Sequence, residues 1–310
     1  MKKKILTLII LLFTTMTTIA QNKQGNICYH YQQVDNVNVF YREAGDPQKP
    51  TILLLHGFPS SSFMFRDLMP LLMDDYHLIA PDMPGFGQTD APTKPLYEYT
   101  FDNLAKTIDR FTELLGLEHF SMYIFDYGAP VGMRMAMWHP ERITAIISQN
   151  GNCYREGLGK KWDARAAYWA HPTPELRKQY ASAYALETIR GQYVNGTPDG
   201  SVAPDGYTLD YAYMQLPGRK DENDDLIFDY QTNVALYPQM QEYLRQHRPP
   251  LLAVWGKNDP SFIPAGAEAF KRDLPDAEIH FVDSGHFALE SHAAEIADII
   301  KQFLKGKHKQ

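Results

Sequence analysis

Cysteine is scarce in this sequence, because its 310 residues contain two, Cys28 and Cys153. Two cysteines so far apart do not make a disulfide framework, and we expect them to be free, buried thiols. No group of cysteines and histidines has the spacing of a metal site. We therefore expect neither a metal ion nor another cofactor.

Clusters of positive charge are also rare. Lysine and arginine number 30 against 37 aspartates and glutamates, which gives a formal net charge of −7. The basic residues are dispersed, apart from Lys2–Lys4. A nucleic-acid-binding surface needs concentrated positive charge, so we expect no nucleic-acid partner.

The sequence begins with an apolar run, Ile5–Phe13, that is too short to span a bilayer as a permanent helix. Lys2–Lys4 precede this run, and Thr18–Ala20 follow it. A basic start, a short apolar segment and a small final residue are typical of a secretory signal peptide. We expect residues 1–20 to be removed and the mature protein, from about Gln21, to be periplasmic or secreted without a stable membrane anchor. An N-terminal helix that stays as an anchor is the alternative.

Strand-like and helical segments alternate through most of the chain. Two alternating runs joined at Asp35-Asn36 predict a hairpin, and short apolar runs predict six further strands. Between residues 152 and 246 comparable runs are missing, and helical pieces predominate. The sequence therefore predicts an α/β protein with an eight-stranded, mostly parallel sheet and an inserted helical cap. The core comprises residues 21–151 and 247–310, and the cap residues 152–246. The expected strands are Cys28–Val34, Val37–Glu43, Thr51–Leu55, His77–Ala80, Phe120–Phe125, Ile143–Ser148, Leu251–Trp255 and Glu278–Val282.

Two helices have recognisable starts. Ser60–Ser62 predict the start of a helix that runs through Met73. Thr100 is expected to cap the next helix, and Gly116 to end it.

Asp126 stands where the central strand Phe120–Phe125 turns directly into a helix. Such a turn holds one side chain out of the sheet at the positive end of the helix. A carboxylate in this position is a nucleophile that needs no base to activate it. Asp259 and His286 also follow strands, and ligands gather at this end of an open α/β sheet. The order nucleophile, acid, histidine therefore predicts a catalytic triad.

These motifs resemble the α/β-hydrolase superfamily, in particular its epoxide hydrolase and haloalkane dehalogenase branch. The resemblance covers essentially the whole mature chain, and most relatives carry serine where this chain has Asp126. It implies that Asp126 attacks an sp³ carbon and forms an alkyl ester, which water activated by His286 then hydrolyses. The usual residue two positions before the nucleophile is small, and Ile124 is expected to crowd the turn. The motifs are His56–Pro59, Asp82–Gly87, Asp126–Ala129, Trp255–Asp259 and Gly285–Phe287.

The resemblance also assigns supporting roles. Asp259 fixes the tautomer of His286 and stabilises its imidazolium form. Backbone N–H groups of Phe58 and Tyr127 form the oxyanion hole for ester hydrolysis. His56 is expected to be structural, because it ties the Gly-Phe-Pro turn in place.

An epoxide hydrolase also needs a cap tyrosine to protonate the opening ring. Tyr230, in Asp229–Asn233, matches the segment that carries one such tyrosine. Relatives supply a second tyrosine from the first cap helix, but here Arg165 falls at that position and Tyr168 lies one turn later. Phe58, Tyr127, Trp169, Tyr230 and Phe287 are expected to line the site, with Tyr168 as a further substrate-binding candidate.

Epoxide hydrolysis of a small apolar substrate is the preferred interpretation, and dehalogenation is the alternative. Many dehalogenases have tryptophan directly after the nucleophile, where this chain has Tyr127, although Trp162 and Trp169 offer halide donors from the cap. Tyr127 and Pro130 leave no arginine clamp of the fluoroacetate-cleaving type. A protein that only binds a small apolar ligand is a third interpretation, although such a protein has no need of His286 and Asp259.

Overall fold

The computed structural model of the chain describes residues 26–307. The expected signal peptide lies outside these residues, so export stays a prediction. No helix within the described range is both long and apolar enough to cross a bilayer.

The centre of the molecule is an eight-stranded sheet in the order β1-β2-β4-β3-β5-β6-β7-β8. The β1–β2 and β2–β4 pairs are antiparallel, and the other pairs are parallel. The middle strands β4 and β5 are buried along their whole length, as their apolar sequences predict. The strands are β1 (Cys28–Val34), β2 (Val37–Ala44), β3 (Thr51–Leu55), β4 (His77–Pro81), β5 (Phe120–Phe125), β6 (Ile143–Gln149), β7 (Leu251–Gly256) and β8 (Glu278–Val282). The predicted α/β-hydrolase architecture is therefore confirmed.

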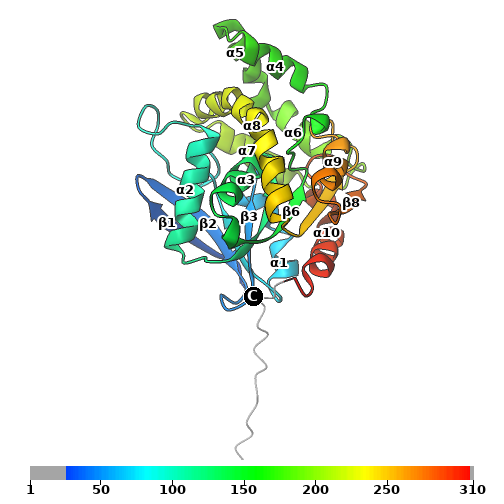
Figure 1. Cartoon of the computed structure of the whole chain (residues 1–310). Coiled ribbons are helices and arrows are strands. Elements are labelled where there is room, and N and C mark those ends of the chain that lie inside the picture. The colour runs from blue at the N-terminus through cyan, green and yellow to red at the C-terminus, as the bar shows by residue number, and fades with distance from the viewer. Residues whose placement is uncertain (1–25, 308–310) are drawn as a thin grey trace, which may run out of the picture.

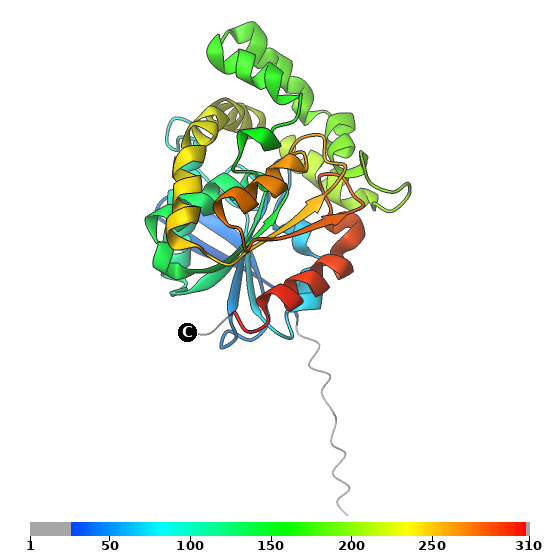
Figure 2. The same cartoon turned by 45° about the vertical axis from the view of Figure 1, so that its right-hand side comes forward.

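Helices cover both faces of this sheet (Figures 1 and 2). One layer contains α2 (Phe101–Leu114), α3 (Gly128–Trp138) and α9 (Ala265–Asp273), and the opposite layer contains α1 (Met69–Leu72) and α10 (Leu289–Leu304). Thr100 caps α2, because its hydroxyl accepts a hydrogen bond from the Asn103 N–H, as expected.

The single helix expected from Ser60–Ser62 through Met73 is wrong. The structure has a short 3₁₀ turn, η1 (Ser62–Phe65), and then the single turn α1. Pro70 lies in the first turn of α1, where its missing N–H costs nothing, but it prevents an earlier helix from continuing through this point.

Five helices lie between β6 and β7 and sit above the carboxyl ends of the strands (Figure 1). The longest, α8, returns along α3 to the core, whereas α4 and α5 project at the top of the molecule in both views. These helices occupy the segment predicted to be the cap, and the exact division into domains stays a prediction. The elements are α4 (Trp162–Ala170), α5 (Pro174–Gln179), α6 (Leu186–Val194), α7 (Pro204–Met214) and α8 (Arg219–His247), with the 3₁₀ turns η3 (Arg155–Gly157) and η4 (Tyr180–Tyr184). A further 3₁₀ turn, η2 (Pro140–Arg142), connects α3 to β6.

Both cysteines are free thiols, as expected. Cys153 is buried, but Cys28 is exposed, so the expectation of two buried thiols is wrong for Cys28. Cys28 begins β1, which lies at the edge of the sheet and leaves alternate side chains in solvent.

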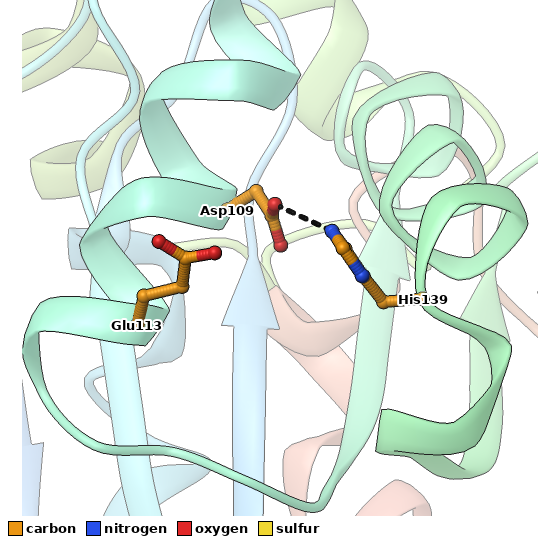
Figure 3. A group of neighbouring side chains, drawn as sticks. All are labelled: Asp109, Glu113 and His139. Atoms are coloured by element: carbon orange, nitrogen blue, oxygen red, sulfur yellow. Dashed lines mark ion pairs between the residues drawn. The ribbon is translucent and has the colours of Figure 1, made fainter.

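Asp109, Glu113 and His139 form a cluster where the last turn of α2 meets the end of α3 (Figure 3). The Asp109 carboxylate pairs with His139 Nε2 at 3.2 Å and with Arg142 Nη1 at 2.8 Å. Glu113 pairs with Arg110 at 2.7 Å. These carboxylates already have cationic partners, so the cluster is explained as a clamp between two helices.

Candidate active site

Asp126 occupies the sharp turn between β5 and α3 with a φ of +46°, in the left-handed region that non-glycine residues rarely adopt. Small neighbours make this turn possible. A Cβ on Gly57 would lie 2.3 Å from Asp126 Cβ, and a Cβ on Gly128 would lie 2.3 Å from the Leu55 carbonyl oxygen. The strained backbone therefore holds the carboxylate above the sheet, as the motif predicts.

Ile124 fits into this turn because α3 has a glycine opposite it. A Cβ on Gly132 would lie 2.7 Å from Ile124 Cγ2, which is closer than carbon atoms normally approach. The bulk expected to crowd the turn is thus accommodated by the missing side chain one helical turn into α3.

Asp126, His286 and Asp259 converge from the ends of β5, β8 and β7. His286 Nδ1 lies 2.7 Å from Asp259 Oδ2, and His286 Nε2 lies 3.5 Å from Asp126 Oδ2. Asp259 and His286 are each 2% exposed and Asp126 is 7% exposed, so solvent screens these charges weakly. The three residues lie in the arrangement that a nucleophile, a base and its orienting acid require.

Asp259 is itself held in place by two neighbours. Its Oδ1 accepts a hydrogen bond from the Ser261 N–H at 2.7 Å, and its Oδ2 accepts one from Asn150 Nδ2 at 2.8 Å. Asn150 Oδ1 in turn accepts from the Gly256 N–H at 3.0 Å. Sequence reasoning missed Asn150, although a polar residue directly after β6, at the same sheet edge as the triad, was a usable signal.

Two opposing effects set the protonation of His286. Burial lowers its pKa, whereas the charge and hydrogen bond of Asp259 and the nearby carboxylate of Asp126 raise it, and the net result is a pKa of about 9. When both carboxylates are ionised, the imidazole therefore holds its second proton at neutral pH.

The Phe58 N–H donates a hydrogen bond to Asp126 Oδ1 at 2.7 Å, and Tyr127 is the N-cap residue of α3. This places the two expected oxyanion-hole residues beside the nucleophile. His56 Nε2 accepts from the Met83 N–H at 2.9 Å, so its Nδ1 carries the proton and donates to the Gly57 carbonyl at 3.1 Å. These bonds tie the Gly-Phe-Pro turn to the loop after β4, which is a structural task.

Aromatic rings from the cap lie over the residues at the strand ends, Asp126, Asp259 and His286, which we call the catalytic floor. The Tyr230 ring, on α8, lies 5.7 Å from the Tyr127 ring, 4.5 Å from the Trp162 ring and 6.3 Å from the Trp169 ring. Tyr230 is completely buried, and its hydroxyl lies near that of Tyr237 without a well-aligned hydrogen bond. The Tyr127 hydroxyl is also buried without a partner among the described residues. Two phenol groups beside the nucleophile thus remain available to a ligand.

The cap indoles, in contrast, already donate to the backbone. Trp162 Nε1 donates to the Ser261 carbonyl at 2.9 Å, and Trp169 Nε1 donates to the Ile227 carbonyl at 3.1 Å. An indole has one N–H, so neither ring can give a hydrogen bond to a halide without breaking one of these contacts.

Two other candidates are packed within aromatic clusters. Tyr168 lies against Tyr180 and Phe228, with ring centroids 5.1 and 5.3 Å away, so its suggested substrate contact gains no support from its position. Phe287 is stacked on Tyr193 at 3.9 Å directly beside His286. Its position favours support of the histidine, and contact with substrate stays a prediction.

Comparison with known proteins agrees with the fold described above. Residues 50–293 match the family described as the alpha/beta hydrolase fold. An uncharacterized hydrolase of Saccharomyces cerevisiae is 46% identical over 285 residues, which cover 90% of this chain and 98% of the yeast protein. A haloalkane dehalogenase of Mycobacterium marinum is 24% identical over 86% of this chain and 88% of its own.

Among solved structures, that of a putative epoxide hydrolase from Pseudomonas aeruginosa is similar with a TM-score of 0.74. Its sequence identity is 18%, and the match covers 91% of this chain and 96% of the other, so it shows a shared fold. The family match spans most of the chain and includes strands β3 to β8 and the loops that carry Asp126, Asp259 and His286. The protein is a member of the α/β-hydrolase family.

Proposed function

We propose that this hydrolase opens epoxides through an ester on Asp126. The observation that carries the proposal is the identity and placement of the nucleophile: a carboxylate at the elbow, 2.7 Å from the Phe58 N–H and 3.5 Å from His286 Nε2. Acyl transfer to a carboxylate would give an anhydride, whereas attack on an sp³ carbon gives an ordinary ester.

In the first step, an Asp126 oxygen attacks an epoxide carbon and the carbon–oxygen bond of the ring breaks. The departing oxygen stays attached to the substrate and takes the hydroxyl proton of Tyr230. Burial raises the pKa of Tyr230 well above its usual value, so the phenol is protonated at neutral pH. It gives up the proton because the developing alkoxide is the stronger base.

In the second step, His286 Nε2 takes a proton from water while the water oxygen attacks the ester carbonyl. The Phe58 and Tyr127 N–H groups stabilise the oxyanion, and its collapse releases the diol and the Asp126 carboxylate. The proton on His286 then passes through solvent to the Tyr230 phenolate, which balances the cycle.

Formation of the ester prepares His286 for its role as a base. The charge of Asp126 contributes to the raised pKa of the imidazole, and esterification removes that charge. Burial, which lowers this pKa, then opposes Asp259 alone. The pKa of His286 falls, and the histidine loses its extra proton when a base is needed.

Epoxide opening is favoured over dehalogenation by the hydrogen-bond donors above Asp126. The Tyr230 hydroxyl has a proton to give, whereas the Trp162 and Trp169 indoles are occupied by backbone carbonyls. A leaving halide needs such donors but takes no proton. Haloalkane dehalogenation is the second candidate, because relatives of that name match along most of the chain.

The His286→Gln variant tests the mechanism and the substrate together. Incubation with matched epoxides and haloalkanes should give intact protein heavier by one substrate, with the added mass on Asp126, because hydrolysis of the ester is blocked. Epoxides should add mass and haloalkanes should not. Normal turnover without an adduct would exclude the ester mechanism, and an adduct from haloalkanes alone would establish the second candidate.

A further inference from the structure

Two cations stand at the start of α4 without a local reason to be there. Lys161 is the N-cap residue of this helix, and Arg165 follows four residues later, on the same face. The N-terminal end of a helix favours negative charge, and like charges at this spacing repel each other. Helix stability therefore does not explain the pair.

Within the described part of the chain, no acidic side chain is in contact with either cation. Within residues 26–307, the side chains of Lys161 and Arg165 form neither an ion pair nor a hydrogen bond. On α5, by contrast, Arg177 pairs with Asp221 at 3.0 Å and with Asp225 at 2.8 Å. The arginine of α5 is thus neutralised by acidic side chains, whereas the two cations of α4 have no such partners in this range.

Arg165 is half-buried beside the aromatic rings of the site, and Lys161, one turn earlier, is exposed. The Arg165 guanidinium carbon lies 4.3 Å from the centre of the Trp162 ring, and this ring packs 4.5 Å from Tyr230. Burial raises the pKa of Tyr127, and the positive charge of Arg165 opposes this rise. Burial and Arg165 lower the pKa of Lys161, whereas Asp259 and Asp126 raise it.

The hydroxyls beneath the cations are an independent sign of a polar ligand. Tyr127 and Tyr230 are 1% and 0% exposed, and neither hydroxyl has a well-aligned partner among the described residues. Unpartnered buried hydroxyls are costly, and a ligand with oxygen atoms would satisfy them.

We propose that Lys161 and Arg165 form a carboxylate-binding subsite, and that the substrate is a small organic acid whose reactive carbon lies at the other end. This inference rests on the proposed function and replaces the purely apolar substrate expected from sequence. A carboxylate substrate is repelled by Asp126 and Asp259, and two cations on the cap offset this repulsion. The guanidinium of Arg165 lies over an indole and forms no hydrogen bond with another described residue, so its N–H groups are free for a bidentate contact.

The test measures binding without turnover, so it is independent of the reaction. Hexanoate and 1-hexanol, which share a chain length and carry no leaving group, are titrated by calorimetry into wild type, Arg165→Gln and Lys161→Gln. Wild type should bind hexanoate at least about tenfold more tightly than hexanol, and Arg165→Gln should remove about tenfold of this preference. Lys161→Gln should remove a smaller part of it.

Two variants control for the general loss of a cap cation. Arg190→Gln removes an exposed arginine of α6 that pairs with Glu187, and Lys160→Gln removes the lysine before Lys161, which is exposed like Lys161 but precedes the N-cap. Both should keep the preference for hexanoate. Equal losses in the controls and in the test variants would overturn the subsite.

Titration with bromide and turnover of a neutral epoxide separate the failure of the subsite from the failure of the proposed reaction. If bromide binds more tightly than hexanoate and Arg165→Gln abolishes this binding, the cations serve a leaving group and the inference is wrong. If hexanoate is preferred but no epoxide is opened, the subsite stands and the proposed reaction fails. If neutral epoxides are opened but hexanoate has no advantage over hexanol, the reaction stands and the subsite fails.

Discussion

The carboxylates of the catalytic floor have hydrogen-bond partners within the described part of the protein, whereas two polar side chains of the cap beside them do not. On the floor, Asp259 is fixed by Asn150 and by the Ser261 N–H, and Asp126 by the Phe58 N–H. In the cap, the hydroxyl of Tyr230 and the charge of Arg165 have no such partners. The difference teaches that the two carboxylates have fixed positions, whereas the open groups of the cap can still pair with a ligand; in the proposed function the first carry the reaction and the second select the substrate.

Among the changes to the catalytic floor, removal of the Asp126 carboxylate should lower turnover most. Asp126→Asn replaces the attacking carboxylate with an amide, so turnover should fall by about 10⁴-fold or more. Substrate binding should persist, because the cap is unchanged. Steady-state rates and calorimetry check both statements. Residual ester formation in the variant would mean that another residue attacks the substrate.

The charge balance of the floor predicts a dependence of stability on pH. The pKa of His286 rises from 6.5 to about 9 on folding, so the protonated imidazole stabilises the native state fully below about pH 6.5. As the pH rises from about 6.5 to 9, up to about 3 kcal/mol of this contribution should be lost. Urea unfolding of wild type against His286→Gln measures it, and a difference independent of pH would contradict the assignment.

On the cap side, Tyr230→Phe tests the proton donor. The change removes one hydroxyl from a buried ring, and epoxide opening should fall by about 10²-fold because the ring oxygen then leaves without a proton. Tyr243→Phe is a matched control, since Tyr243 lies on the same helix and its buried hydroxyl also lacks a partner. Equal effects on both variants would assign the loss to packing.

Removing the hydrogen bond that Asn150 donates to Asp259 should have a smaller effect. Asn150→Gly removes the amide that donates to Asp259 and keeps the φ of +47° accessible, because glycine adopts this conformation freely. We expect kcat to fall by about tenfold through looser orientation of His286. Asp35→Gly makes the same kind of change at φ +48° in the β1–β2 turn and should leave kcat unaltered. An unaltered rate in Asn150→Gly would show that Ser261 suffices to hold Asp259.

Where the chain is locally periodic, the sequence and the structure agree closely. The strands Thr51–Leu55 and Phe120–Phe125 have the bounds expected from their side-chain patterns, because a buried strand requires an unbroken run of apolar residues. The helix expected through Met73 failed at Pro70, where a local rule outweighed the apolar pattern.

The sequence by itself determined the fold and the place of Asp126 in the turn between strand and helix, because strand alternation and the Asp-Tyr-Gly motif are local patterns. It also placed Asp259 and His286 at strand ends, since parallel strands present their carboxyl ends at one edge. Tertiary structure alone decided that Asn150 supports Asp259, that Gly132 makes room for Ile124, and that Lys161 and Arg165 remain unpaired. These are relations between segments far apart in the chain, and distance in space, which the linear order does not encode, governs hydrogen bonding and charge.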